Sequence, residues 1–202
     1  FGLMKLYGGD KAFQNRLDEL FKMDLPEKYY VDNEDITAEG LVGGYVHGNE
    51  PSHHIPYLYA WTSAPWKSQE RLRTIMNQMY KDHIRGLSGN DDCGQMSAWY
   101  LFSAMGFYPV CPGSDQYVMG APFLPYMKVN LTNGNAITIK APGVSNKNRY
   151  IQSVKVNGKP YTKLYFTHKQ LTDGAVIEYK MGSKPNTKRG LDAADKPYSM
   201  TK

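Results

Sequence analysis

The sequence has no uninterrupted apolar run of about 18 residues, so we expect no helix that spans a bilayer. It has only two cysteines, Cys93 and Cys111, and no CxxC pair, which excludes a disulfide framework and a cysteine-based zinc site. It also lacks helix-turn-helix, zinc-finger and ribonucleoprotein signatures. The net charge of +5 comes from basic residues spread singly through the second half. We interpret them as a solvated face and expect no nucleic-acid partner.

The composition is that of an ordinary folded protein. Hydrophobic residues make up 41% and charged residues 21% of the 202 residues, a mixture that is typical of one or two globular domains. The first residue is Phe1, and a helical pattern begins almost at once. We therefore expect this chain to be a piece of a larger polypeptide.

Apolar residues recur at helical spacing through the first half of the chain. Asp10 precedes the first such segment and is the expected N-cap, and Gly106 follows the last and is the expected left-handed C-cap. The spacing predicts helices from Asp10 to about Met23, from about Pro51 to Ser63, from about Trp66 to Ile84, and from about Gly94 to Met105.

After Pro109 the hydrophobic period changes to two, which indicates β-strands. Three turn signals, Asn133-Gly134, Asn157-Gly158 and Asp173-Gly174, predict antiparallel hairpins between them. Helices first and strands second favour the α+β class. We expect a helical part over residues 1–117 and an antiparallel β subdomain with its tail over residues 118–202.

Three of the five histidines lie in the segment from Tyr45 to His54, which we call the histidine motif. The segment also carries Asn49 and Glu50 beside an expected helix start, whose dipole favours anionic groups. A functional site is one interpretation. The other makes Asn49 a helix cap and the histidines ordinary buried hydrogen-bonding groups.

A second polar segment, from Gly86 to Trp99, is called the acid motif. Its adjacent carboxylates, Asp91 and Asp92, repel each other unless a helix N-terminus, a metal or a bound donor offsets the charge. Capping of the following helix explains one aspartate but leaves the other, with Asn90 and Gln95, unexplained. Function is therefore favoured here. The acidic run at residues 32–35 is instead interpreted as hydrated, with cation binding as the alternative.

Together, the stretches GYVHGNEPSHHIPYLY, GLSGNDDCGQMSAWYLFSAMGFYPV and EYKMGSKPN resemble the C-terminal part of glycoside hydrolase family 92. The resemblance runs from about Phe1 to Gly190. Members of this family are calcium-dependent exo-acting α-mannosidases with an N-terminal β-sandwich and an (α/α)6 catalytic toroid. The resemblance implies that the helices here belong to the end of that toroid. It also implies an inverting enzyme that removes terminal mannose, with α-1,2 linkages as the expected substrate.

The resemblance also implies roles for individual residues. Inversion requires a carboxylate that activates water; the matching stretch makes Asp92 the expected base and Asp91 the second choice. Relatives often carry a third acid where this sequence has Asn90. The histidine motif matches the region that shapes the sugar subsites. The implied substrate-binding residues are His47, Glu50, His53, His54, Asn90 and Gln95, and the implied calcium ligands are Glu50 and the carbonyl of Asn49.

The family's general acid lies in a Glu-rich motif that nothing in this sequence matches. We therefore expect that the N-terminal remainder of the enzyme supplies it, and that the isolated chain is inactive. Family substrates imply mannose-containing glycans such as N-glycans, and a periplasmic or extracellular location. The alternative function is a non-catalytic carbohydrate-binding module.

Overall fold

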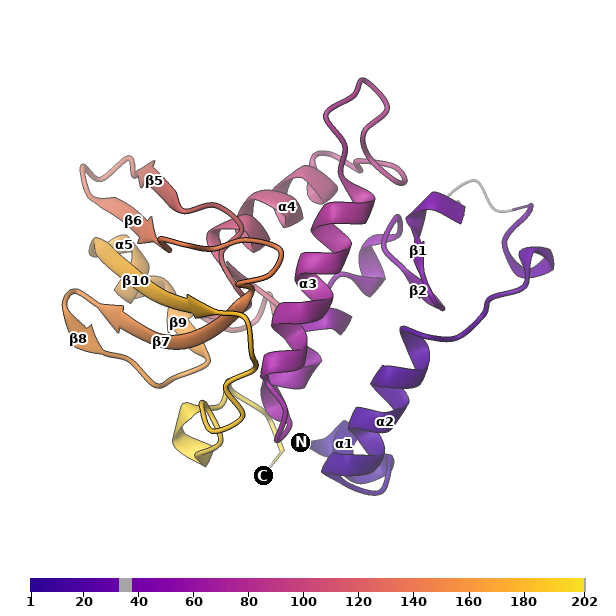
Figure 1. The fold of residues 1–202 in the computed structure, drawn as a ribbon, viewed down its shortest axis with the longest axis horizontal. Helices are drawn as coiled ribbons and strands as arrows, with labels where there is room; N and C mark the ends of the chain where they lie inside the picture. The colour runs from indigo at the N-terminus through magenta and orange to yellow at the C-terminus, as the bar shows by residue number, and fades with distance from the viewer. Residues whose placement is uncertain (33–37, 202) are drawn as a thin grey trace.

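The structure is a computed structural model that describes residues 1–32 and 38–201. Most of the acidic run at residues 32–35 therefore lies outside the described residues. The longer helices lie on one side of the molecule and the larger β-sheet on the other (Figure 1), which confirms the α+β class. In the part of the chain that is described, no helix combines the length and apolar character that crossing a membrane requires.

The helical side follows the predicted pattern with shifted ends. Gly106 caps the last helix in the left-handed conformation, with φ of +96°, as predicted. The helix predicted to reach Ile84 ends earlier because Tyr80 becomes extended and forms a β-bridge with Leu87. The α-helices on this side are α1 (Gly2–Leu6), α2 (Asp10–Leu20), α3 (Trp66–Met79) and α4 (Gln95–Met105).

Two expectations about helices are wrong. The predicted helix from Pro51 to Ser63 consists instead of two 3-10 segments, η3 (Glu50–Ser52) and η4 (Ile55–Trp61). Pro56 has no N–H to donate, so a continuous α-helix through this region would lose an internal hydrogen bond. Asp10 is not the N-cap of α2, because Gly9 holds that position and the Asp10 carboxylate binds other partners.

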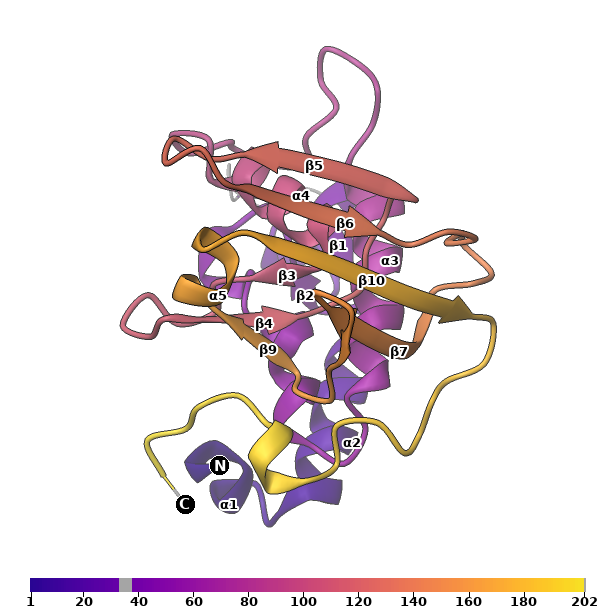
Figure 2. The same cartoon turned by 90° about the vertical axis from the view of Figure 1, so that its left-hand side faces the viewer.

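The strands form two main sheets and a small hairpin (Figure 2). The larger sheet has the order β5-β6-β10-β7-β8, and a smaller sheet has the order β3-β4-β9. The hairpin pairs β1 (Leu41–Val42) with β2 (Tyr45–Val46). The other strands are β3 (Phe107–Tyr108), β4 (Gln116–Met119), β5 (Tyr126–Asn130), β6 (Ala136–Lys140), β7 (Tyr150–Val156), β8 (Lys159–Pro160), β9 (Tyr165–Thr167) and β10 (Ala175–Gly182).

Two of the three predicted hairpins are confirmed. The turns at Asn133-Gly134 and Asn157-Gly158 join β5 to β6 and β7 to β8, each pair antiparallel. The third prediction is wrong, because Asp173-Gly174 joins the short helix α5 (His168–Thr172) to β10. β10 then inserts beside β6 in parallel, so the large sheet is mixed rather than purely antiparallel. The boundary expected at residue 117 stays a prediction.

Helix α3 lies between the two halves and contributes to both. Its apolar face, including Leu72, Ile75 and Met79, is fully buried in the helical core. On the sheet side, the Gln69 side-chain oxygen accepts a hydrogen bond of 2.8 Å from the amide of Ile151 in β7. The helical half is therefore fixed to the sheet through α3.

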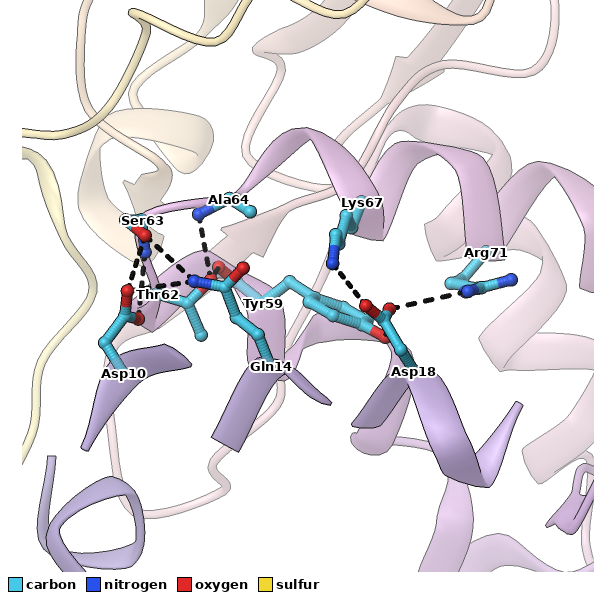
Figure 3. Close-up of polar contacts among 9 residues, drawn as sticks. All are labelled: Asp10, Gln14, Asp18, Tyr59, Thr62, Ser63, Ala64, Lys67 and Arg71. Atoms are coloured by element: carbon cyan, nitrogen blue, oxygen red, sulfur yellow. Dashed lines mark hydrogen bonds and ion pairs between the residues drawn. The ribbon is translucent and has the colours of Figure 1, made fainter. Parts of the chain in front are cut away.

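Polar contacts attach α2 to the same framework (Figure 3). At the start of α2, the Asp10 carboxylate accepts a 3.0 Å hydrogen bond from the amide of Ser63 and a 2.9 Å bond from the Gln14 amide group. Gln14 also donates to the Ser63 hydroxyl over 2.8 Å. These bonds join the first turn of α2 to the segment between η4 and α3.

About two turns after Asp10, Asp18 meets three partners (Figure 3). Its carboxylate accepts a 2.9 Å hydrogen bond from the Tyr59 hydroxyl and another from Lys67, and Arg71 lies 3.5 Å away. Partial burial acts to raise the pKa of Asp18, but the hydrogen bonds and the two positive charges outweigh it and hold the pKa below its usual value.

We predict that Asp18→Asn lowers the free energy of unfolding by about 2 kcal/mol at neutral pH, because bonds to a charged, half-buried group are lost. A lowered folded pKa stabilises the folded state above the unfolded pKa, and this stabilisation disappears as the pH falls through the folded value. Urea unfolding should thus show a difference from wild type that shrinks below about pH 4. The matched control is Glu19→Gln, which removes only an exposed pair with Arg16. Equal effects of the two variants would contradict the prediction.

Candidate functional site

The histidine and acid motifs meet through two glycines. A Cβ atom added to Gly48 would lie 2.2 Å from the carbonyl oxygen of Ser88. One added to Gly89, whose φ is +146°, would lie 2.5 Å from the Cα atom of Gly48. Such distances are far below van der Waals contact, so only glycine fits at either position. Gly48 and Gly89 are 41 residues apart in sequence, yet the fold brings their backbones into direct contact.

Behind this contact, His47 is completely buried, with 0% of its surface exposed. The Tyr45 hydroxyl lies 2.9 Å from its Nδ1, and the Tyr80 hydroxyl lies 2.7 Å from its Nε2. Burial, with a smaller effect of nearby His53, lowers the pKa of His47 to about 3. His47 is therefore neutral near pH 7, and both ring nitrogens are engaged by tyrosines.

His53 and Gln95 extend this buried network. His53 Nε2 donates a 3.0 Å hydrogen bond to the carbonyl oxygen of His47, which leaves Nδ1 as an acceptor. The Gln95 amide nitrogen lies 3.4 Å from that Nδ1 and donates a 2.8 Å bond to the Tyr108 hydroxyl. Burial lowers the pKa of His53 as well. Trp99 Nε1 donates to the His53 carbonyl over 3.1 Å, so α4 is bonded to the histidine motif.

The acid motif turns sharply before α4. Asp92, Cys93 and Gly94 all have positive φ, of +42°, +57° and +89°. A non-glycine residue in the left-handed region costs roughly 1–2 kcal/mol, and such conformations concentrate at functional sites. This turn therefore holds Asp92 in a conformation that an unconstrained chain would avoid.

The two aspartates have different surroundings. Asp91 Oδ1 accepts hydrogen bonds from the amide and the hydroxyl of Ser97, at 2.9 and 3.0 Å, so it ties the turn to the first turn of α4. The predicted capping role of an aspartate is wrong in position, because Gly94 is the N-cap residue of α4 and Asp91 binds the first turn from three residues further back. Asp92 is exposed, and within residues 1–32 and 38–201 no hydrogen bond or ion pair engages its carboxylate. That carboxylate is accessible to solvent.

The other predicted site residues lie on the same two segments at different depths. Asn90 is exposed, whereas Asn49 and Glu50 are half-buried. His54 is exposed and borders a cavity of about 260 Å³ that is also lined by residues of α2. The structure thus brings the two motifs together. The proposed sugar-binding and catalytic roles of these residues stay predictions.

The described residues do not complete a metal centre. Among residues 1–32 and 38–201, no three His, Cys, Asp or Glu side chains gather in a group that would hold an ion. Calcium takes six to eight oxygen ligands. Glu50 and the Asn49 carbonyl therefore fit only as part of a ligand set.

Sequence reasoning missed three residues of this network: Tyr45, Tyr80 and Tyr108. Tyr80 lies within the helix predicted from about Trp66 to Ile84, and helical spacing predicts no role for its hydroxyl. The sequence holds no signal for its partners, because the helix end at Met79 is seen only in the structure.

Comparison with known proteins identifies the family. Residues 1–183 match the Glycosyl hydrolase family 92 catalytic domain. The chain is 30% identical over 201 residues to an uncharacterized secreted glycosidase of Arthroderma benhamiae, and the match covers 98% of this chain and 23% of that protein.

Solved structures of two proteins from Bacteroides thetaiotaomicron are also similar. The family GH92 α-mannosidase BT3965 shares 43% identity with a TM-score of 0.86, over 95% of this chain and 24% of that one. The family GH92 inverting mannosidase BT2199 shares 37% identity with a TM-score of 0.84, over 100% of this chain and 28% of that one. The chain thus spans about a quarter of the length of these relatives. From the match over residues 1–183, the chain belongs to glycoside hydrolase family 92.

Proposed function

We propose that this chain contributes the water-activating half of the active site of an inverting, calcium-dependent exo-α-mannosidase. The observation that carries the proposal is the strained, exposed turn at Asp92, pressed against the histidine motif through Gly48 and Gly89. The family match and the likeness to two mannosidases support the substrate class. The printed description of BT2199 as inverting supports the stereochemical course.

In the proposed reaction, the Asp92 carboxylate accepts a proton from a water molecule as its oxygen attacks the anomeric carbon of a terminal mannose. The bond from that carbon to the glycosidic oxygen breaks on the opposite face, and a carboxylic acid donates a proton to the departing oxygen. In inverting enzymes the two carboxyl groups lie about 6.5–9.5 Å apart, which leaves room for the water. We propose that the acid belongs to a remainder of the enzyme outside this chain. The greater length of the relatives, of which this chain covers about a quarter, supports such a remainder.

The finer parts of the proposal concern substrate and location. Terminal α-1,2-linked mannose of N-glycans is the proposed substrate, and the proposed residues of its binding region are His53, His54, Glu50, Asn90 and Gln95. His47 is fully buried with both ring nitrogens engaged, so we do not propose that it contacts the sugar. A location outside the cytoplasm, periplasmic or extracellular, is supported by the relative that is described as secreted.

We predict that Asp92→Asn in the full-length enzyme lowers kcat by about 10²–10⁴-fold, because the amide cannot accept the proton from water. Mannoside binding should persist. The loss of turnover with binding intact also separates a hydrolase from a carbohydrate-binding module, which has no turnover to lose. Steady-state kinetics and calorimetric binding measure the two quantities. The control is Asp173→Asn, which removes an exposed pair with Lys169 far along the sequence. Full activity of the Asp92 variant, or its loss only in Asp91→Asn, would reject Asp92 as the base.

We predict that the isolated 202-residue chain does not hydrolyse α-mannosides, because it lacks the proton donor for the leaving oxygen. Release of mannose from a synthetic aryl α-mannoside is the assay, and the full-length enzyme at equal concentration is the positive control. Turnover by the purified 202-residue chain would contradict the prediction.

We predict that chelation with EGTA abolishes the activity of the full-length enzyme and that added Ca²⁺ restores it. Glu50 and the Asn49 carbonyl would then complete a site whose other oxygen ligands come from outside the described residues. Glu50→Gln should raise the Ca²⁺ concentration needed for half-maximal activity. Full activity of the metal-depleted enzyme would exclude the metal.

A further inference from the structure

The buried hydrogen bonds around His47 have a fixed direction. The Tyr80 hydroxyl donates its single proton to the carbonyl oxygen of Met96, over 3.1 Å. His47 Nε2, 2.7 Å from the same hydroxyl oxygen, must therefore carry a proton and donate it. Because neutral imidazole has only one N–H, Nδ1 is the acceptor, and the Tyr45 hydroxyl donates to it. Hydrogen bonds thus run in one direction, from Tyr45 to His47, from His47 to Tyr80 and from Tyr80 to the carbonyl of Met96, and each proton has one acceptor.

This series of hydrogen bonds ends at Met96, next to the turn that carries Asp92. Met96 lies in the first turn of α4, and its amide donates a 3.3 Å hydrogen bond to the carbonyl of Asp91. The neighbouring amide of Gln95 donates to the carbonyl of Asp92 over 3.2 Å. Residues 95 and 96 therefore bind the strained turn on one side and the Tyr80 hydroxyl on the other.

Aromatic packing holds the same groups in place. The ring of Tyr80 is nearly parallel to that of Trp99, with 5° between the planes and 6.0 Å between centroids. The His47 ring meets Trp99 edge-on at 4.4 Å. Packing of this kind is favourable and holds the Tyr80 and His47 rings beside Trp99, so the atoms that form the hydrogen bonds stay within reach of one another.

We propose that His47 and Tyr80 are positioning residues, whose buried hydrogen bonds hold the histidine motif against the first turn of α4 and so set the direction of the Asp92 carboxylate. This inference rests on the proposed function, in which Asp92 activates water. It assigns His47 a role through the turn rather than through contact with the sugar. Since the Gly48 backbone touches Gly89, a shift of His47 would move both motifs together.

The test variant is Tyr80→Phe in the full-length enzyme. It keeps the ring that packs on Trp99 but removes the hydroxyl, so His47 Nε2–H loses its acceptor and the Met96 carbonyl loses its donor. We expect kcat per folded molecule to fall about 10-fold or more, since small displacements of a reacting group cost up to about 10²-fold. KM should change less than threefold.

The matched control is Tyr117→Phe. Tyr117 also bonds a histidine through its hydroxyl, 3.0 Å from His168 Nδ1, but it lies in β4 on the sheet side. Its kcat and KM should equal those of the wild type. A second pair of variants tests His47 directly: His47→Gln, which can still donate and accept hydrogen bonds, should retain more turnover than His47→Phe.

The outcomes separate this inference from the proposed function. An unchanged kcat for Tyr80→Phe, with only a lower thermal midpoint, would overturn the positioning role and leave a structural one. A raised KM at unchanged kcat would also overturn it. If Asp92→Asn is fully active, the proposed function fails first. If Asp92→Asn is inactive and Tyr80→Phe is normal, only the positioning inference fails.

Discussion

The contact between the backbones of Gly48 and Gly89 is the constraint on which the candidate site depends. A side chain at either position would overlap the opposite backbone, so the two motifs approach this closely only because both residues are glycine. Hydrophobic burial of α3 and α4 brings the segments into the same region. The glycines then decide how near the acid motif comes to the histidine motif.

The site divides into a buried layer and an exposed layer. The buried layer is made of side chains that bond to tyrosines and to the backbone, namely those of His47, His53 and Gln95. Burial keeps the His47 imidazole neutral near pH 7. Asp92 and Asn90 face outward. The buried network fixes the backbone from which the Asp92 side chain extends, because residues 95 and 96 bind both the turn and the network.

Local pattern was sufficient where local chemistry decides the structure. Gly106 and the Asn-Gly turns were predicted because a positive φ restricts the choice of residue. The parallel insertion of β10 beside β6 was not, since no local signal encodes which distant strand becomes a neighbour. The same holds for the site: Asp91 and Asp92 stand out by their adjacent charges, whereas the part played by Tyr80 depends on a contact 33 residues away.

The central claim is that the two motifs form one sugar-binding surface with Asp92 as the group that activates water. A crystal structure of the full-length protein with a bound mannose-like inhibitor tests it most directly. The account predicts that residues 48–50 and 89–92 both border the sugar. It also predicts a water molecule hydrogen-bonded to the Asp92 carboxylate on the face of the anomeric carbon opposite the leaving oxygen. An inhibitor bound away from these residues, or Asp92 directed away from the sugar, would contradict it.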